Sequence, residues 1–325
     1  MKILVTPKSL NSTQPIVAMD DLRAFADTLV FNETGHPLGP TELLPLLADV
    51  DGVLAGLDTY DERVLAGAPR LRVVSRYGAG CDNVDLAAAS ARNIVVTNTP
   101  GANAEAVADL AIGLMLSVAR RIPLLHRAVQ AGEWRVSRGV ELYGKTLGIV
   151  GAGAIGRAVA RRARGFSMRL LCHDPYVGDA AMAEEGMEAM ALDELLRRSD
   201  VVSLHLPSTP QTFHLVGPGA LGLMKPGVIL VNTSRGELVD EEAVRGALVE
   251  GRLGGFGTDV YSVEPPTAGG LLSFDNVVTT PHTGAHTGEA VARMAELAVR
   301  NLIDVLSGHE CRNVVNAIHH ATLAR

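Results

Sequence analysis

Short runs of consecutive apolar residues recur along the chain, bounded by glycine, proline or polar residues. Uninterrupted runs of this kind are typical of strands in a parallel sheet that is covered on both faces. Between them, apolar residues recur at helical spacing, as at Val107, Leu110, Ala111 and Leu114, which predicts a helix over about 104–121. Further helices are expected over 241–248 and 288–306. The predicted strands cover residues 3–5, 52–55, 71–74, 94–97, 146–150, 168–173, 201–205, 228–232, 255–258 and 277–280.

The alternation of strands and helices predicts an α/β protein with two doubly wound parallel sheets. A chain of 325 residues is long enough for two domains. The last helix and the short segment after it are too small for a domain of their own, so we expect them to complete the N-terminal one. The expected domains are therefore residues 1–99 with 288–325, which bind the substrate, and an inserted dinucleotide-binding domain over 100–287.

One predicted strand runs directly into a glycine pattern. Gly151, Gly153 and Gly156 form Gly-x-Gly-x-x-Gly between that strand and a helical segment, which is the arrangement of a dinucleotide-binding turn. The first glycine allows a tight turn, the second lets the backbone approach a pyrophosphate, and the third lets helix and strand pack closely. Asp174 ends the next strand, about 20 residues after the turn, where an acid accepts the adenosine ribose hydroxyls. Because Pro175 and not an arginine follows this acid, NAD is predicted in preference to NADP.

Composition narrows the classes of function. Hydrophobic residues make up 47% of the chain and charged residues 20%, which is typical of a globular protein. The formal charge of −7 argues against binding to nucleic acid or to an anionic membrane. The N-terminus lacks the character of a signal peptide and the apolar runs are too short to span a bilayer, so a cytoplasmic protein is expected. Cys81, Cys172 and Cys311 lack the spacing of metal ligands, and no metal site is predicted.

Three ionisable residues follow strand ends in the second half of the chain. Arg235, Glu264 and His282 each come directly or a few residues after a predicted strand, and ligands of open α/β sheets bind at that edge. An arginine can hold a substrate carboxylate through paired donors. A histidine can give a proton to a carbonyl oxygen or take one from a hydroxyl, and a carboxylate beside it orients the ring and favours its protonated form. This set suits hydride transfer between NAD(H) and a 2-hydroxy or 2-oxo acid.

A loop in the N-terminal half offers a second anion site. Arg76 and then Gly78, Ala79 and Gly80 follow a predicted strand. Glycines leave backbone N–H groups accessible, which suits a carboxylate. The pattern is equally consistent with a plain turn, and for Arg76 contact with a substrate phosphate and solvation in a loop both stay open.

Four segments resemble the D-isomer-specific 2-hydroxyacid dehydrogenase family: residues 144–151, 231–236, 259–266 and 280–284. The resemblance covers nearly the whole chain and implies a Rossmann NAD-binding domain inserted into a flavodoxin-like substrate domain. It implies that Arg235, Glu264 and His282 are catalytic, with Arg235 and His282 contacting the substrate. It also implies that Asp259 binds the nicotinamide amide and that residues 78–80 bind the substrate carboxylate. The implied cofactor contacts are Gly151, Gly153, Ala154, Ile155, Gly156, Asp174, Leu206, Pro207, Thr233, Ser234, Arg235, Asp259, His282, Gly284 and Ala285.

The resemblance also bears on substrate and assembly. The opening segment and residues 74–85 look most like the phosphoglycerate dehydrogenase branch, so 3-phosphoglycerate is the expected substrate. A glyoxylate or hydroxypyruvate reductase is the alternative, because we expect no regulatory extension after the single catalytic unit. A corepressor-like NAD sensor is an alternative of another class, but it would not need the arginine, glutamate and histidine. A homodimer through the dinucleotide-binding domain is implied.

Overall fold

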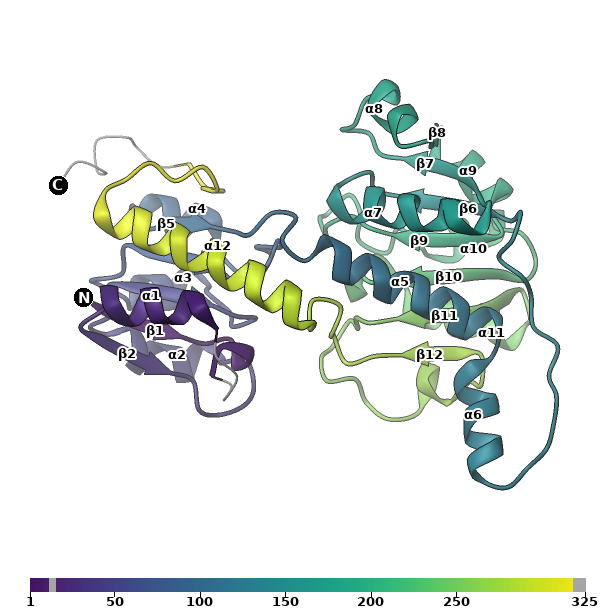
Figure 1. The fold of residues 1–325 in the computed structure, drawn as a ribbon, viewed down its shortest axis with the longest axis horizontal. Helices are drawn as coiled ribbons and strands as arrows, with labels where there is room; N and C mark the ends of the chain where they lie inside the picture. The colour runs from purple at the N-terminus through teal and green to yellow at the C-terminus, as the bar shows by residue number, and fades with distance from the viewer. Residues whose placement is uncertain (12–15, 318–325) are drawn as a thin grey trace. The chain divides into compact units, whose positions relative to one another are not determined.

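The computed structural model describes residues 1–11 and 16–317. The chain folds as two compact units, Met1–Asn103 with His286–Arg325, and Ala104–Ala285. Each unit is built on one parallel sheet, which confirms the predicted fold class (Figure 1). The predicted domain boundaries, after residue 99 and before residue 288, lie close to these divisions. The functional roles given to the two domains stay predictions, and residues 12–15 and 318–325 of the expected first domain lie outside the described residues.

The first unit contains a five-stranded sheet in the order β2-β1-β3-β4-β5, and all its pairings are parallel. This is the flavodoxin-like order of a doubly wound sheet. The sequence pattern predicts every strand except β2, which lies at the edge of the sheet and is only partly buried. The strands are β1 (Lys2–Val5), β2 (Thr28–Phe31), β3 (Gly52–Ala55), β4 (Val73–Arg76) and β5 (Val95–Thr97).

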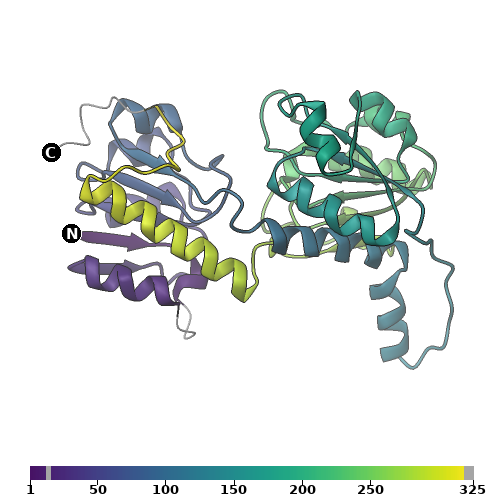
Figure 2. The same cartoon turned by 45° about the horizontal axis from the view of Figure 1, so that its top comes forward.

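Helices cover both faces of this sheet. The long α12 (Gly288–Ser307) lies beside α1 (Val17–Phe25) on one face, as Figures 1 and 2 show, and together they bury the apolar side chains of β1 on that face. The other face is covered by α2, α3 and α4. After α12 the chain returns to the edge strand β5, where Val314 pairs antiparallel with Thr97. The shorter helices are η1 (Lys8–Asn11), α2 (Pro40–Leu47), α3 (Glu62–Ala66) and α4 (Leu86–Ala91).

The second unit contains a seven-stranded parallel sheet in the order β12-β11-β10-β9-β6-β7-β8. This is the Rossmann order with one further strand, β12, at the edge. The strand order reverses between β6 and β9, and ligands of such sheets bind at the carboxyl ends of the strands around that point. The strands are β6 (Thr146–Val150), β7 (Arg169–His173), β8 (Glu188–Ala189), β9 (Val201–Leu204), β10 (Val228–Asn232), β11 (Leu253–Thr258) and β12 (Val277–Thr279).

Two helices, α5 (Ala104–Ala119) and α7 (Ala154–Ala163), cover one face of this sheet, and α9, α10 and α11 cover the other. α6 (Ile122–Gln130) projects away from the sheet (Figures 1 and 2). Among the described residues, no helix combines the length and the apolar character that crossing a bilayer requires. The remaining helices are η2 (Arg164–Phe166), α8 (Asp179–Glu184), α9 (Leu192–Arg198), α10 (Pro218–Leu223), η3 (Gly236–Leu238), α11 (Glu241–Val249) and η4 (Gly270–Ser273).

Candidate active site

The glycine turn joins β6 to α7, and its three glycines serve different purposes. Gly151 has a φ of 103°, and a Cβ at this position would lie 2.3 Å from the carbonyl oxygen of His205. A Cβ on Gly156 would lie 2.0 Å from the carbonyl oxygen of Gly151. At Gly153 nothing lies within 4 Å of such a Cβ, and the residue is exposed at the start of α7. The first and third glycines are therefore needed for packing, whereas the second leaves room for a phosphate at the positive end of the helix.

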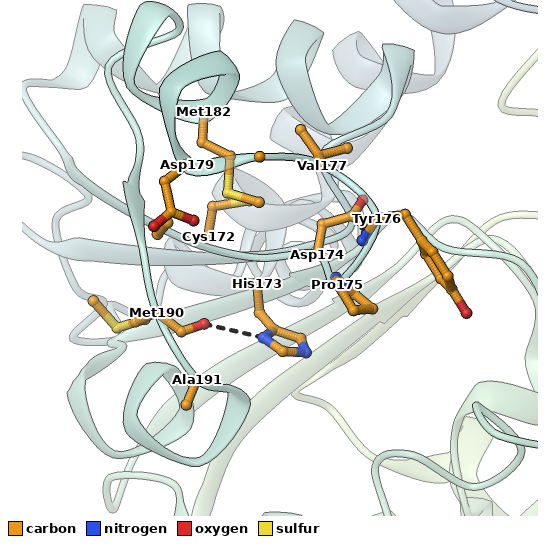
Figure 3. A pocket seen from close by; sticks show the side chains of 12 residues that line it. Cys172, His173, Asp174, Pro175, Tyr176, Val177, Asp179, Met182, Met190 and Ala191 are labelled. Atoms are coloured by element: carbon orange, nitrogen blue, oxygen red, sulfur yellow. Dashed lines mark hydrogen bonds between the residues drawn. The ribbon is translucent and has the colours of Figure 1, made fainter.

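Asp174 follows β7 directly, and two backbone groups anchor its carboxylate. Oδ2 accepts a hydrogen bond from the backbone N–H of Ala152 in the glycine turn at 2.8 Å, and Oδ1 accepts one from Tyr176 at 2.9 Å. The acid borders a surface cavity of about 540 Å³ beside the ends of β7 and β8 (Figure 3). His173 forms part of the wall, with its Nδ1 3.0 Å from the carbonyl oxygen of Met190. The predicted ribose-binding acid is thus fixed beside the turn and next to a cavity.

The loops after β9 and β10 carry further predicted cofactor contacts. Leu206 is half-buried and Pro207 is exposed. Ser234 is buried and donates through Oγ to the carbonyl oxygen of Leu204 at 2.7 Å. The buried hydroxyl of Thr233 has no hydrogen-bond partner within the described residues. Because an unpaired buried polar group costs about 1–3 kcal/mol, a ligand group that bonds this hydroxyl would be stabilised here.

The sequence interpretation assigned no role to His205, which follows β9. Its Nε2 lies 2.8 Å from Oγ of Ser203, and its Nδ1 is buried without a partner in the described part of the chain. Burial lowers the pKa of this imidazole to about 3, so the ring is neutral. Its place at the carboxyl end of a predicted strand, over 201–205, was the only sequence signal for it.

Arg235 follows β10 in a tight turn. The side-chain amide of Asn232 donates to the carbonyl oxygen of Arg235 at 2.7 Å. A Cβ on Gly236 would lie only 2.0 Å from the carbonyl carbon of Tyr261. The Arg-Gly turn therefore packs directly on the loop after β11, and only glycine fits at this contact. The same loop carries Glu264 three residues further on.

His282 and Glu264 form a pair. Nδ1 of His282 lies 2.8 Å from Oε2 of Glu264, and the two side chains are 30% and 34% exposed. Burial raises the pKa of Glu264, but the hydrogen bond and charge of His282, a backbone hydrogen bond from Tyr261 and the charge of Arg235 outweigh it and hold that pKa below 4.5. Glu264 is therefore ionised at neutral pH. Its bond to Nδ1 orients the ring and leaves Nε2 as the nitrogen that can exchange a proton with a ligand.

Asp259 follows β11 and is 1% exposed. Its Oδ1 accepts hydrogen bonds from Oγ1 of Thr280 at 2.6 Å and from the backbone N–H of Thr283 at 2.8 Å, and its Oδ2 accepts one from Gly284 at 2.8 Å. These bonds hold the loop in which His282 has a φ of 51°, an uncommon value outside glycine. The carboxylate predicted to bind the nicotinamide amide therefore holds the His282 loop, and the nicotinamide contact stays a prediction.

The predicted substrate loop lies in the first unit, after β4. Arg76 is 4% exposed, and its guanidinium donates to Oδ1 of Asn83 at 3.0 Å and to two backbone carbonyl oxygens. Gly78, with a φ of 151°, packs on that guanidinium. The backbone N–H groups of Ala79 and Gly80 donate no hydrogen bond within the described residues. Arg76 therefore supports the loop, its contact with substrate stays a prediction, and the two N–H groups could receive an anion.

Comparison with known proteins identifies the family. A profile described as "D-isomer specific 2-hydroxyacid dehydrogenase, NAD binding domain" matches residues 112–284. The chain belongs to the D-isomer specific 2-hydroxyacid dehydrogenase family. This dehydrogenase is 44% identical over 282 residues to a glyoxylate reductase of Korarchaeum cryptofilum, covering 84% of this chain and 85% of the relative.

Two other relatives differ in coverage. The dehydrogenase is 41% identical over 288 residues, 87% of its length, to a D-3-phosphoglycerate dehydrogenase of Methanocaldococcus jannaschii, but spans only 55% of that protein. The solved structure of the TT0316 protein from Thermus thermophilus matches with 41% identity and a TM-score of 0.87, covering 97% of this chain and 100% of the other. The fold therefore has a counterpart among solved structures that matches nearly the whole of this chain.

The protein is an NAD-dependent 2-hydroxyacid dehydrogenase, and the second unit suits a dinucleotide. The open position at Gly153, the anchored Asp174 and the hydroxyl of Thr233, which has no partner among the described residues, fit the predicted NAD contacts, and these contacts stay predictions. The strand order β7-β6-β9-β10-β11-β12 places the predicted contacts in one row from Asp174 to His282. Ala154 and Ile155 begin α7, and Ala285 ends the unit. In the part of the chain that the structure describes, no group of three or more potential metal ligands gathers.

Proposed function

We propose that this dehydrogenase interconverts a small 2-oxo acid, glyoxylate or hydroxypyruvate, and the corresponding 2-hydroxy acid. The His282–Glu264 pair carries the proposal, because Glu264, on the loop that packs on the Arg235 turn, fixes the imidazole of His282 through Nδ1 and leaves Nε2 for a ligand. When bound, NADH supplies a hydride to the carbonyl carbon of the substrate. The chain itself must then bind the carboxylate, supply a proton to the carbonyl oxygen and orient both partners.

Each of these tasks has a candidate group. His282 gives its proton from Nε2 to the carbonyl oxygen during reduction and takes it back from the hydroxyl in the reverse direction. The ionised Glu264 stabilises the positive charge on the ring. Arg235 binds the substrate carboxylate and polarises the carbonyl. In the first unit, the N–H groups of Ala79 and Gly80, which have no partner among the described residues, are a separate candidate anion site.

Two observations favour glyoxylate or hydroxypyruvate over the 3-phosphoglycerate that the sequence suggested. The relatives that match over most of both lengths are named glyoxylate reductases. The relatives named D-3-phosphoglycerate dehydrogenase are much longer, and the chain spans about half of each. Arg76, the residue expected to contact a phosphate, is buried and donates to the protein itself. The alternative substrate class is therefore the better supported one.

A substrate panel tests the proposal. The loss of NADH absorbance is followed with glyoxylate, hydroxypyruvate and pyruvate, and the formation of NADH is followed with NAD and 3-phosphoglycerate. We expect the highest kcat/KM with glyoxylate or hydroxypyruvate. A higher value with 3-phosphoglycerate would restore the first interpretation. NADH binding without turnover of any 2-oxo acid would favour a sensor.

We also propose that the enzyme is a homodimer through its second unit. α6 and the segment after it project from the sheet (Figures 1 and 2), and Trp134 and Val136 in that segment are 92% and 94% exposed. Exposed apolar surface of this kind marks a protein contact, and a two-fold dimer would bury it on both copies. Light scattering should give the mass of a dimer for the wild type and of a monomer for Val136→Asp. A monomeric wild type at micromolar concentration would contradict this proposal.

A further inference from the structure

Four arginines lie on or directly after α7, and one of them differs from the others. Three form ion pairs with carboxylates on neighbouring segments. Arg157 has no carboxylate within ion-pair distance in the described part of the chain, although it is half-buried. The paired residues are Arg161 with Glu105 and Glu185, Arg162 with Glu105 and Asp109, and Arg164 with Glu185, at distances from 2.6 to 3.7 Å.

Arg157 turns back toward the glycine turn instead. Its Nε donates to the carbonyl oxygen of Ala152 at 2.8 Å, and the N–H of the same Ala152 donates to Asp174 at 2.8 Å. The guanidinium of Arg157 and the predicted ribose-binding carboxylate of Asp174 therefore both bond to the backbone of the same residue, Ala152. Both charges act on the buried thiol of Cys172. Burial and the charge of Asp174 raise the pKa of this thiol to about 12, and the charge of Arg157 lowers it in part. Both charged groups thus bond to Ala152 and lie near Cys172, and they form no ion pair with each other in the described part of the chain.

A guanidinium and a carboxylate near the adenosine ribose bear on the choice between NAD and NADP. NADP differs from NAD by a phosphate on the 2′ oxygen of the adenosine ribose, next to the acid that accepts the ribose hydroxyls. A carboxylate repels this phosphate, whereas a guanidinium binds it through charge-assisted hydrogen bonds. The prediction of NAD from the sequence considered only the residue directly after the acid, where this chain has Pro175 and not an arginine. In the folded chain, Arg157 of α7 contacts Ala152, the residue that also bonds to this acid.

We propose that Arg157 binds the 2′-phosphate of NADPH and is a second determinant of cofactor choice, acting against Asp174. Its Nε donates to Ala152, and its two terminal nitrogens donate no hydrogen bond within the described residues, so their donors can bind a ligand. In the wild type the carboxylate dominates, so NADH binds more tightly than NADPH. Once the acid is removed, the arginine decides the preference. The proposal concerns the cofactor alone and does not depend on which 2-oxo acid is reduced.

Fluorescence titrations of NADH and NADPH test this directly, without turnover. The proteins compared are the wild type, Asp174→Ser, Arg157→Gln and the double variant. Asp174→Ser should bind NADPH about tenfold more tightly than the wild type does, and adding Arg157→Gln should remove most of that gain. Arg157→Lys should retain part of it, because a lysine keeps the charge but not the planar fork. Arg161→Gln is the matched control, since it removes an arginine from the same helix but away from the turn.

The NADH titrations separate ligand binding from support of the turn. If Arg157 only held the carbonyl of Ala152, its replacement would weaken both dinucleotides by the same factor. Equal loss for both, or no loss for either, would overturn the proposal. So would an Asp174→Ser variant that does not gain affinity for NADPH. A loss for NADPH at least several times larger than that for NADH supports it.

Discussion

Replacing Asp259 by asparagine tests what holds the loop that carries His282. Three donors converge on the two carboxylate oxygens, and asparagine offers only one oxygen. Either the N–H of Gly284, or the donors of Thr280 and Thr283, would then face an amide N–H₂. A hydrogen bond to a charged group contributes about 1.5–3 kcal/mol, and about 1.4 kcal/mol is a factor of ten. We therefore expect opening of residues 280–284 to become roughly ten- to a hundredfold more frequent in Asp259→Asn.

Hydrogen exchange measures this opening, and kinetics measures its consequence. The amides of Thr283 and Gly284 should exchange faster by that factor, because exchange requires the loop to open. The value of kcat should fall, since His282 is held less firmly. Asp240→Asn is the matched control: Asp240 accepts backbone N–H groups of Glu242 and Ala243 at the start of α11. It should loosen that helix end and leave kcat unchanged.

Two results would refute this reasoning. Unchanged exchange at Thr283 and Gly284 in Asp259→Asn would mean that the carboxylate does not hold the loop. A variant that loses only NADH affinity, with exchange and kcat preserved, would point to the nicotinamide contact expected from the family resemblance. Loss of both exchange protection and kcat, with NADH affinity retained, is the outcome that the geometry predicts.

Three further predictions follow from the site. His282→Ala should lower kcat by about a hundredfold or more and leave the Kd of NADH unchanged, and a fully active variant would remove His282 from the mechanism. Gly236→Ala places a Cβ 2.0 Å from the backbone of Tyr261, so urea unfolding should show a loss of about 1–3 kcal/mol; Gly246→Ala, where nothing lies within 4 Å of the added atom, should be neutral or stabilising. The pKa of Glu264 is depressed below 4.5, so its contribution to stability is present above pH 4.5 and is lost as the pH falls through the depressed pKa. The difference in unfolding free energy between the wild type and Glu264→Gln should shrink over that acidic range, and a difference that does not change there would contradict the assignment.

The sequence by itself determined the features that depend on near neighbours in the chain. Consecutive apolar residues specified the buried strands, because a strand covered on both faces needs apolar side chains at every position. The glycine spacing specified the turn at Gly151, since only glycine tolerates that φ and that contact. The edge strand β2 was not predicted, although its apolar run is as long as that of β1, because a run this short cannot be told from a buried helix segment by its pattern alone.

Tertiary structure alone decided which distant groups meet. Asp259 holds a loop more than twenty residues further along the chain, Gly236 packs on Tyr261, and Arg157 folds back onto Ala152 beside Asp174. Arg76 does not lie in a solvated loop: it is buried and donates to carbonyl groups, and its contact with substrate stays a prediction. These partners depend on strand order and on the path of loops across the sheet edge. The apolar pattern predicts which side chains are buried. It does not predict which polar groups form hydrogen bonds with one another in the folded chain.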